Sequence, residues 1–556
     1  MYQYNQVDHQ LIKERVAQFR DQTQRFINGE LPLAEYLPLR LQNGLYVQRH
    51  APMLRVAIPY GLLNATQVRK LAHIARQYDK GYAHISTRQN MQFNWPALEQ
   101  VPDILEELAE VEMHAIQTSG NCIRNVTTDQ FAGVAHDEVA DPRAVCEMLR
   151  QWSTFHPEFA FLPRKFKIAV SADAEDRAGV KVHDIGIKVR RDDGKIGYDI
   201  YVGGGLGRTP MIGSLIKEKL EGEFLLPYLE AILRIYNRYG RRDNKYKARI
   251  KILVKALTPE VFAERVQQEF EIIKDGDLHT SQEKLEYYES FFKLLVEPLT
   301  ADTLSSVKAT LEADKAADPA FANWVQRNVR PHKLDGYANV TLSLKCTDIP
   351  PGDVSDDQLD AIADFADEFS KGQIRTTHFQ NMVLTDVQED QLKALYSKLV
   401  PLKLATANTG YITDIICCPG GDFCALANAK SIPVAADIQQ VFDDQDYIYD
   451  LGPLDLNISG CMNACGHHHV GHIGILGVDK KGEEFYQLSV GGSSKDNASI
   501  GKILGPSISR EDIAGAVKKV IDVYVEQRHE GEDFLSTLER IGTAEMKERV
   551  YAKPAS

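Results

Sequence analysis

The sequence has little positive charge and no long apolar segment. Its 64 Lys and Arg residues stand against 78 Asp and Glu residues, which gives a formal net charge of −14. A chain this acidic is a poor candidate for binding nucleic acid, because phosphate backbones attract a basic surface. No apolar run approaches the roughly 20 residues that cross a bilayer. We therefore expect neither a nucleic-acid partner nor a membrane partner.

Secretion signals and disulfide patterns are also lacking. The opening residues, MYQYNQVDHQLIKERV, are polar and charged and contain no apolar signal-peptide core. Only eight cysteines occur in 556 residues, and five of them fall between positions 417 and 465. These features predict a cytoplasmic protein whose cysteines do not form a disulfide framework. The clustering of the five cysteines requires a chemical reason.

An internal repeat organises the chain, whose length alone predicts about three to five domains. The triplet Gln89-Asn90-Met91 returns 291 positions later as Gln380-Asn381-Met382, each time between two patterns typical of helices. Asn64 and the pair Ser355–Gln358 are typical N-caps for the first helix of each set. Three further matches share an offset of 288 positions: Ile185-Gly186-Ile187 with Ile473-Gly474-Ile475, Val202-Gly203-Gly204 with Val490-Gly491-Gly492, and Ile212-Gly213 with Ile500-Gly501.

The repeat predicts an α+β protein with a pseudo-twofold, duplicated architecture. Each half contains a small α/β module followed by a larger α+β module. The predicted boundaries are an N-terminal extension at 1–45, a small module at 46–117, a large module at 118–290, a helical connector at 291–332, a second small module at 333–405, a second large module at 406–545 and a tail at 546–556.

The clustered cysteines form two pairs. Cys418 and Cys424 are separated by five residues that include Pro and Gly, and Cys461 and Cys465 are separated by three. Four thiolates of this kind suit a [4Fe–4S] cluster. Zinc is the main alternative, although its sites favour shorter gaps in both pairs, and buried structural cysteines are a third interpretation. Cys417 falls outside the C-x5-C spacing.

These motifs resemble the sulfite/nitrite reductase family, which uses sirohaem and a [4Fe–4S] cluster. The resemblance extends over about residues 46–545. The motifs that carry it are Asn457-Ile-Ser-Gly-Cys461-Met-Asn-Ala-Cys465 with the Cys418–Cys424 loop, Met53-Leu-Arg55, Thr87-Arg88-Gln89, Asn121-Cys-Ile-Arg124-Asn125, Leu162-Pro-Arg164-Lys165-Phe-Lys167 and Gly203-Gly204-Gly205.

The resemblance implies the cofactors and the roles of individual residues. The small modules would be ferredoxin-like, and the large modules would hold sirohaem and the cluster. Cys418, Cys424, Cys461 and Cys465 would bind the cluster, with Cys465 also bridging to the sirohaem iron. The substrate anion would be bound by Arg55, Arg124, Lys165 and Lys167, and the eight carboxylates and the ring of sirohaem by Arg88, Gln92, Arg164, Lys245, Lys247 and Asn463.

The glycine stretch has no nucleotide-binding pattern. Gly203-Gly204-Gly205-Leu206-Gly207 lacks the G-x-G-x-x-G spacing and the βαβ context. We favour close approach of the backbone at Gly203 and Gly204 to the haem or cluster over a plain turn. Since no flavin or nicotinamide motif occurs, electrons must come from a separate protein, either ferredoxin or a flavoprotein reductase.

The repeat suggests that the two halves have different roles in the site. Aligning Pro163 with Pro453 places Ser171 on Cys461, so that the first half lacks the sulfur ligands and offers cations instead. We expect the two halves to supply opposite sides of one site.

The substrate prediction depends on Lys167. Nitrite-specific relatives commonly carry Asn at this position and sulfite reductases carry Lys, and a second cation suits the sulfite dianion. We therefore predict a six-electron reduction of sulfite to sulfide. Reduction of nitrite to ammonia is the alternative. A zinc-stabilised, non-redox binding protein is the alternative from a different class.

Overall fold

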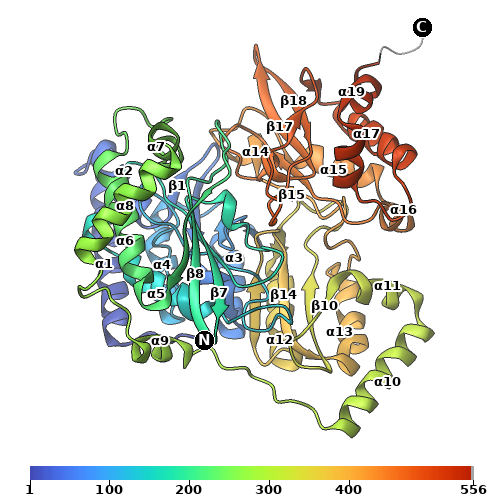
Figure 1. The fold of residues 1–556 in the computed structure, drawn as a ribbon, viewed down its shortest axis with the longest axis horizontal. Coiled ribbons are helices and arrows are strands. Elements are labelled where there is room, and N and C mark those ends of the chain that lie inside the picture. Colours follow the sequence, from blue (N-terminus) through green and yellow to red (C-terminus); the bar gives the residue numbers. More distant parts are fainter. Residues whose placement is uncertain (553–556) are drawn as a thin grey trace.

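The computed structural model describes residues 1–552, which form four β-sheets flanked by helices (Figure 1). Most neighbouring strands are antiparallel; the parallel pairs lie only at one edge of the six-stranded sheet and at one edge of the four-stranded sheet. The predicted α+β class is confirmed. Among the described residues no helix is long and apolar enough to cross a membrane.

The first small module is built on a five-stranded sheet. Its strand order is β1 (Leu45–Val47), β2 (Pro52–Val56), β5 (Met91–Phe93), β4 (Tyr82–Ile85) and β12 (Asp353–Ser355). It is accompanied by α1 (Gln6–Ile27), α2 (Leu33–Gln42), α3 (Ala65–Tyr78) and α4 (Val101–Glu110). The stretch around Gln89 is a hairpin turn, in which Gln89 has a φ of 57°. The predicted cap at Asn64 is present as a complete capping box with Gln67.

The second small module repeats this plan. Its sheet has the order β10 (Val329–Pro331), β11 (Tyr337–Leu342), β14 (Met382–Gln388), β13 (Gln373–Thr376) and β3 (Leu62–Asn64). Its helices are α12 (Asp356–Phe369) and α13 (Leu392–Leu399). The Ser355–Gln358 capping box is present, and Gln380 has a φ of 62°, which matches Gln89 in the other half.

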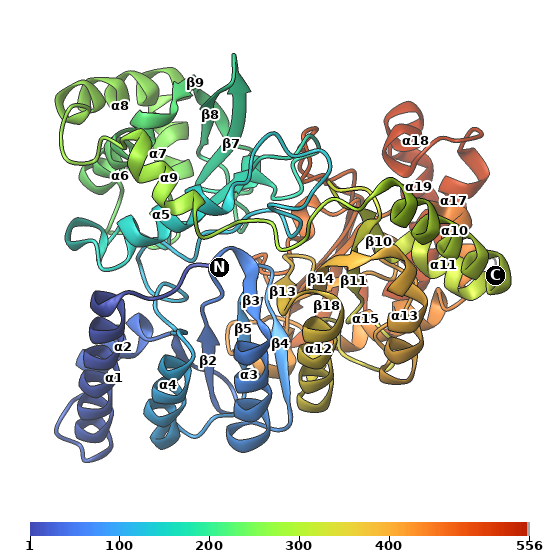
Figure 2. The same cartoon turned by 90° about the horizontal axis from the view of Figure 1, so that it is seen from below.

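The two small modules exchange edge strands. β12 comes from the second half and completes the first sheet by pairing Asp353 with His84. β3 comes from the first half and completes the second sheet by pairing Asn64 with Gln373. The modules share one hydrophobic core, and α3 and α12 pack side by side (Figure 2). The halves are therefore interlocked by main-chain hydrogen bonds.

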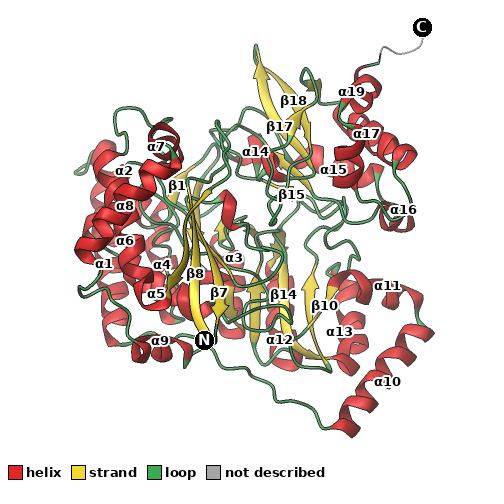
Figure 3. Ribbon diagram, in the orientation of Figure 1, coloured by secondary structure: helices red, strands yellow, loops and turns green. Residues whose placement is uncertain are grey.

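Each large module places helices around a mainly antiparallel sheet (Figure 3). The first has β6 (Ile168–Ser171), β7 (Ile185–Asp192), β8 (Lys195–Val202) and β9 (Ser214–Glu221), with α5 (Arg143–Ser153), α6 (Leu225–Tyr239), α7 (Ile250–Leu257), α8 (Pro259–Ile273) and α9 (Gln282–Glu289). The second has β15 (Ile416–Cys417), β16 (Leu456–Ser459), β17 (Ile473–Lys480), β18 (Glu483–Val490), β19 (Lys502–Ile503) and β20 (Ile508–Ser509), with α14 (Gly420–Phe423), α15 (Ile432–Val441), α16 (Gln445–Leu451), α17 (Ile513–Gln527), α18 (Phe534–Ile541) and α19 (Ala544–Tyr551).

Sheet register corrects the alignment of the two large modules. Ile168 lies opposite Ile185 in the first, and Leu456 lies opposite Ile473 in the second. The offset is therefore 288, which places Ser171 on Ser459 and not on Cys461. The alignment of Pro163 with Pro453 was wrong because the loop between this proline and the strand is two residues longer in the first half.

The connector and the C-terminal region are helical. α10 (Ala301–Ala317) and α11 (Pro319–Asn328) occupy most of the connector. The predicted boundary between residues 545 and 546 falls inside α19, whose Met546 and Val550 pack into the core of the second large module. Residues 553–556 of the predicted tail lie outside the described residues. The division into modules at the stated boundaries stays a prediction.

Candidate functional site

Two loops of the second large module carry the four clustered cysteines. Cys418 follows β15 and Cys424 follows α14, whereas Cys461 and Cys465 follow β16. The N–H of Gly460 lies 3.2 Å from the Cys418 sulfur, to which it donates. A Cβ atom at Gly466 would stand 1.9 Å from the Ile458 carbonyl oxygen, so only glycine fits directly after Cys465. The backbone is therefore shaped to bring both loops together.

The sulfur atoms of these loops influence one another electrostatically. Burial, followed by the charge of Cys465, raises the pKa of Cys418 to about 12. Burial also raises the pKa values of Cys424 and Cys461, and Cys465 contributes to both increases. Four thiolates in such surroundings require a nearby positive centre, because metal binding lowers thiol pKa values outright. The cysteines therefore fit a bound metal cluster.

The spacing of these ligands distinguishes a cluster from a single ion. Zinc binds four ligands at about 2.0–2.3 Å from one centre. Among residues 1–552, no three His, Cys, Asp or Glu side chains gather closely enough to hold one metal ion. A [4Fe–4S] cluster binds its four cysteines at separate corners, so its ligands are spaced more widely. The described residues thus show no gathered single-ion site, and the four cysteines remain compatible with ligands at the corners of a cluster.

The Cys465 loop contacts the first half of the chain directly. The Thr87 hydroxyl donates to the Cys465 carbonyl oxygen at 2.8 Å. Thr87 lies in the β4–β5 turn, next to Arg88. The cluster loops and the cationic residues of the first half therefore meet at Cys465.

Arg55 and Arg124 converge on one carbonyl group. The Thr118 carbonyl oxygen accepts hydrogen bonds from Arg55 at 3.4 Å and from Arg124 at 2.7 Å. Gln92 accepts from the Arg55 Nε at 2.9 Å, and the Gly120 carbonyl accepts from Arg124 at 2.8 Å. Gln92 thus orients Arg55, across a β2–β5 register that pairs the two residues.

Arg88 is buried and held by neutral groups. Its guanidinium donates to the Thr127 hydroxyl at 2.9 Å and to the Asn125 carbonyl at 2.6 Å. Its Nε has no hydrogen-bond partner among the described residues. Burial lowers the pKa of Arg88 to about 9. An anion near Arg88 would offset this cost of burying the charge.

Lys165 and Lys167 precede β6 and lie among other cations. Burial lowers the pKa values of both. The charge of Arg124 further lowers the pKa of Lys165, and the charge of Arg88 further lowers the pKa of Lys167. Arg249 also lowers both pKa values, although Asp184 binds Arg249 at 2.8 and 2.7 Å. Burial lowers the pKa of Arg164 too, again with a contribution from Arg249.

This cationic cluster lacks balancing carboxylates. Within residues 1–552, no Asp or Glu forms an ion pair with Arg55, Arg88, Arg124, Lys165 or Lys167, and the nearby Asp184 is engaged by Arg249. Each contact with an anion at about 4 Å contributes up to about 4 kcal/mol before desolvation is subtracted. The donor set fits a polyanionic cofactor together with a small anion.

Other residues that the sequence predicted are placed less directly. Lys245 and Lys247 are exposed in the loop before α7, and the Lys245 ammonium lies 5.3 Å from the ring centre of Tyr246. Asn463 is exposed in the cluster loop. The structure does not bring the two lysines into the cationic cluster, and their contact with sirohaem stays a prediction.

The glycine stretch is explained first by packing within the chain. A Cβ atom at Gly204 would lie 2.4 Å from the Lys181 carbonyl oxygen, and one at Gly203 would lie 3.2 Å from Val254. Gly207, in contrast, lies beside the carbonyls of Met462 and Asn463, at 3.6 and 3.9 Å from its Cβ position. Within this stretch Gly207 therefore approaches the cluster loop, and the cofactor contacts of Gly203 and Gly204 stay predictions.

Two residues beside the cationic cluster, Arg249 and Tyr46, are not among the residues that the sequence predicted. Arg249 lies two positions after Lys247, and no local pattern indicates its contact with Asp184. Tyr46 has no local signal; the Arg55 guanidinium lies 5.3 Å from its ring centre. Burial alone would raise the pKa of Tyr46, but Arg124 and Arg55 outweigh it and lower that pKa to about 7.

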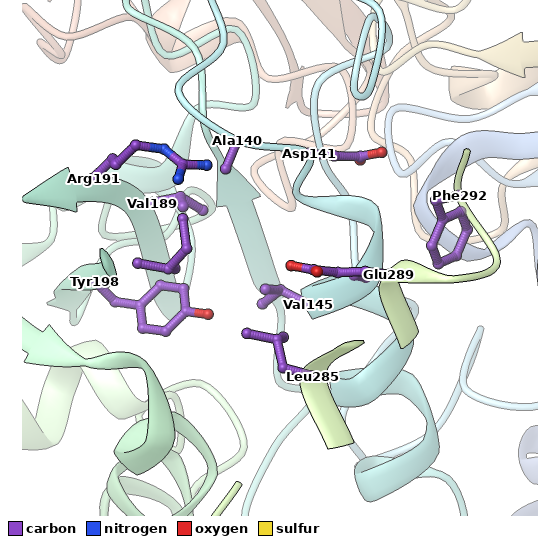
Figure 4. Close-up of a pocket in the computed structure, with 11 residues that line it drawn as sticks. Ala140, Asp141, Val145, Val189, Arg191, Tyr198, Leu285, Glu289 and Phe292 are labelled. Carbon is purple, nitrogen blue, oxygen red and sulfur yellow. The ribbon is translucent and has the colours of Figure 1, made fainter. Parts of the chain in front are cut away.

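A separate cavity of about 180 Å³ lies in the first large module (Figure 4). It is lined by Val189 and Tyr198 from the sheet, Val145 from α5, and Leu285 and Glu289 from α9. None of the residues predicted for substrate or cofactor binding lines it. It is therefore distinct from the cationic cluster.

Comparisons with known proteins agree with this geometry. The "Nitrite and sulphite reductase 4Fe-4S domain" matches residues 119–274 and 410–555, and the "Nitrite/Sulfite reductase ferredoxin-like half domain" matches residues 46–111 and 346–402. Each of these two family domains is thus matched twice, once in each half of the chain, as the repeat predicted.

The individual relatives have low sequence identity to this chain. Sulfite reductase (ferredoxin) 1 of Mycolicibacterium paratuberculosis is 27% identical over 89% of this chain and 83% of its own length. The chloroplastic ferredoxin–nitrite reductase of Arabidopsis thaliana is 24% identical over 86% of this chain and 78% of its own length. The solved structure of Mycobacterium tuberculosis NirA has the same fold, with a TM-score of 0.76, 24% identity and coverage of 93% and 92%.

These matches extend over most of the chain and include both halves of the site. Proteins of this family use sirohaem together with a [4Fe–4S] cluster, so both predicted cofactors are confirmed. The relatives include sulfite and nitrite reductases alike. The chain belongs to the nitrite and sulfite reductase family.

Proposed function

We propose that this chain reduces sulfite to sulfide with electrons from a ferredoxin. One sulfite dianion, six electrons and eight protons give one hydrogen sulfide and three waters. Sirohaem and the cluster supply the one-electron chemistry when they are bound. The observation that carries the proposal is the cationic cluster, in which five side chains lack an acidic partner among the described residues.

Arg55 and Arg124 would hold the oxygens of the bound anion. Both guanidinium groups are already fixed on the Thr118 carbonyl, so little side-chain entropy is lost when the anion binds. Fixed positive charge also stabilises the negative charge that develops on a departing oxygen. We assign these two arginines to charge stabilisation.

Lys165 and Lys167 would donate the protons that convert departing oxygens to water. Their pKa values are lowered, chiefly by burial, and a lysine with a lower pKa is a stronger acid. Nearby cations deepen this effect. Each lysine would then regain its proton from solvent before the next two-electron stage.

Nitrite is the second candidate substrate. Named nitrite reductases are almost as similar to this chain as the named sulfite reductases, so overall similarity does not choose between the two anions. Lys167 favours sulfite, because a second lysine beside Lys165 suits a dianion better than a monoanion.

The test is a steady-state comparison of the two anions with reduced viologen as the electron donor. We expect a higher kcat/KM for sulfite than for nitrite. A kcat/KM for nitrite far above that for sulfite would contradict the proposal.

A Lys167→Asn variant tests the charge argument separately. We expect it to lose sulfite turnover more than nitrite turnover. Lys195→Asn is the matched control, because Lys195 is exposed at the far end of β8. Equal losses for the two anions in Lys167→Asn would remove the reason for preferring sulfite.

A further inference from the structure

The cavity of the first large module has an apolar interior and a charged mouth (Figure 4). Its base is a cross-strand pair, because Val189 of β7 lies opposite Tyr198 of β8. Val145 of α5 and Leu285 of α9 close the space from the other side. An apolar cavity of about 150 Å³ holds a benzene molecule. A cavity of about 180 Å³ therefore has room for the side chain of one large apolar amino acid.

One buried hydroxyl group faces this space without a partner. Tyr198 is fully buried, and its hydroxyl has no hydrogen-bond partner among residues 1–552. Burial, followed by the charge of Glu289, raises the pKa of this phenol, so that it stays protonated and can donate. A trapped water needs roughly two to four polar partners, whereas the neighbouring walls are the apolar side chains of Val145, Val189 and Leu285. The hydroxyl is therefore suited to a polar atom at the end of an otherwise apolar ligand.

The equivalent position in the second half is filled. Strand register aligns Tyr198 with Tyr486 at the offset of 288, and Gly477 takes the place of Val189. The Tyr486 hydroxyl donates to a main-chain carbonyl oxygen at 2.8 Å. A Cβ atom at Gly477 would lie 2.8 Å from the Cβ of Ala429, so no space is left there. The same fold thus gives this tyrosine a partner in one half and leaves it facing a cavity in the other.

Two charges of opposite sign stand at the mouth of the cavity. Glu289 is exposed, and no hydrogen bond or ion pair from a described residue reaches its carboxylate. Arg191 donates to two main-chain carbonyl oxygens, at 3.0 and 3.3 Å, and within residues 1–552 no carboxylate pairs with it. Asp141 also lines the cavity, but Arg143 already binds it. Since Glu289 and Arg191 do not pair with each other, a ligand that carries an ammonium and a carboxylate can bind both.

We propose that this cavity binds a free α-amino acid with a large apolar side chain. The ammonium of the ligand lies at Glu289, its carboxylate lies at Arg191, and its side chain enters the space between α9 and β8. A side chain that ends in a hydroxyl, as in tyrosine, gains a hydrogen bond with Tyr198. The cavity is distinct from the cationic cluster, so the inference does not depend on which anion the enzyme reduces.

Equilibrium dialysis of the loaded enzyme with four probes separates these contacts. Phenylalanine carries both charged groups, 3-phenylpropionate lacks the ammonium, phenethylamine lacks the carboxylate, and tyrosine adds a hydroxyl. We expect phenylalanine to bind about tenfold more tightly than 3-phenylpropionate or phenethylamine, because each of these loses one charge-assisted contact. Tyrosine should bind about fivefold more tightly than phenylalanine. Absence of binding of both amino acids at millimolar concentration would overturn the proposal, and phenethylamine binding as tightly as phenylalanine would show a site for amines instead.

Single variants assign the contacts to residues. Glu289→Gln should weaken the binding of phenylalanine and phenethylamine by about tenfold and leave that of 3-phenylpropionate unchanged. Tyr198→Phe should remove the preference for tyrosine over phenylalanine, and it should fold normally because it deletes only an unpartnered hydroxyl. Glu283→Gln, at the exposed start of α9, is the matched control and should bind all four probes like the wild type.

Circular dichroism and the visible spectrum measure the folding and the cofactor content of each variant. Two results would contradict the assignment in variants that are folded and loaded. One is an unchanged affinity for phenylalanine in Glu289→Gln, and the other is a tyrosine preference that persists in Tyr198→Phe.

Discussion

The two large modules have the same fold but fill equivalent positions with different chemistry. Strand register aligns Asp129 with Cys418, because Thr127 faces Ala169 as Ile416 faces Asn457. The offset of 288 aligns Asp173 with Cys461 and Arg177 with Cys465. The backbone agrees, since Asp176 and its counterpart Ala464 have φ values of 58° and 54°.

In the first half these positions form a closed ion-pair network. Arg177 donates to Asp129 at 2.7 Å and to Asp137 at 2.8 Å, and its N–H donates to Asp173 at 3.0 Å. In the second half the equivalent cysteines need a bound cluster to satisfy them. The same backbone fold therefore supports either a network of ion pairs around Arg177 or a set of cysteine ligands for a cluster.

In the small modules it is the first half that carries the functional side chains. Register aligns Arg55 with Thr341 and Gln92 with Val383, so the second half lacks the anion-binding groups. Val383 packs against Phe131 and Val134, which cover this face. After duplication, each half therefore kept one of the two functions, and the single site needs both.

The largest expected effect follows from exchanging a cluster ligand. Cys465→Ser should abolish sulfite and nitrite turnover and remove the visible absorption of the bound cofactors, because a serine hydroxyl is a poor iron ligand here. Iron content and the absorption spectrum are the measurements. A variant with full iron content and wild-type turnover would contradict the assignment of Cys465.

The second effect follows from giving the first half the residue of the second. Arg55→Thr should lower kcat/KM for sulfite by about 10²-fold, in line with the removal of one fixed charge-stabilising donor. A substitution at the counterpart position of the second half, Thr341→Ser, should leave kcat/KM unchanged. If the two variants behaved alike, the functional difference between the small modules would be disproved.

The third effect concerns stability. Arg177→Met should destabilise the protein by about 3–5 kcal/mol, because Asp129 and Asp137 would be left without their cation. Chemical denaturation with unchanged cofactor content is the measurement. The triple variant Arg177→Met/Asp129→Asn/Asp137→Asn should recover part of the loss; no recovery would show that the charges are not the cause.

The fourth effect is a pH dependence of stability that comes from a buried histidine of the first half. His114 is buried, and its Nδ1 accepts from the Ile116 N–H at 3.2 Å. Its carbonyl accepts from the Ala57 N–H. In the second half the Leu404 carbonyl accepts from the Ser343 N–H in the same way, so Leu404 is the counterpart of His114. Burial lowers the pKa of His114 from 6.5 to about 3. The unfolded chain therefore binds a proton below pH 6.5 that the folded chain does not bind.

Stability should consequently be complete above about pH 6.5 and fall as the pH decreases towards 3, by about 1.4 kcal/mol per pH unit from this group. Replacing it with its counterpart residue, His114→Leu, should reduce the slope of unfolding free energy against pH between 6 and 4. Urea denaturation at several pH values measures this slope. An identical slope in the variant would show that His114 does not titrate in this way.

Local sequence patterns predicted the local structure well. The caps at Asn64 and Ser355 depend on neighbouring residues, and the structure contains both. The cysteine pairs were identifiable because ligand spacing is short. The alignment of Ser171 with Cys461 failed because loop length between a proline and a strand is not encoded in residue identity.

Long-range relations had no sequence signal. The pairing of β3 with β13 and of β12 with β4 joins residues about three hundred positions apart, and no periodicity reveals it. Tyr46 and Arg249 enter the cationic cluster only through tertiary packing. The resemblance to a family supplied the substrate and cofactor residues that spacing alone did not single out.

The exchange of edge strands has a consequence for how the chain folds during synthesis. The sheet that holds Arg55 lacks its β12 edge until residue 355 has left the ribosome, although every other strand of that sheet is made within the first 93 residues. Contacts so distant in sequence form slowly, and an uncovered edge strand invites pairing with other chains. The sheet that positions Arg55 is thus complete only after more than half of the chain has been translated.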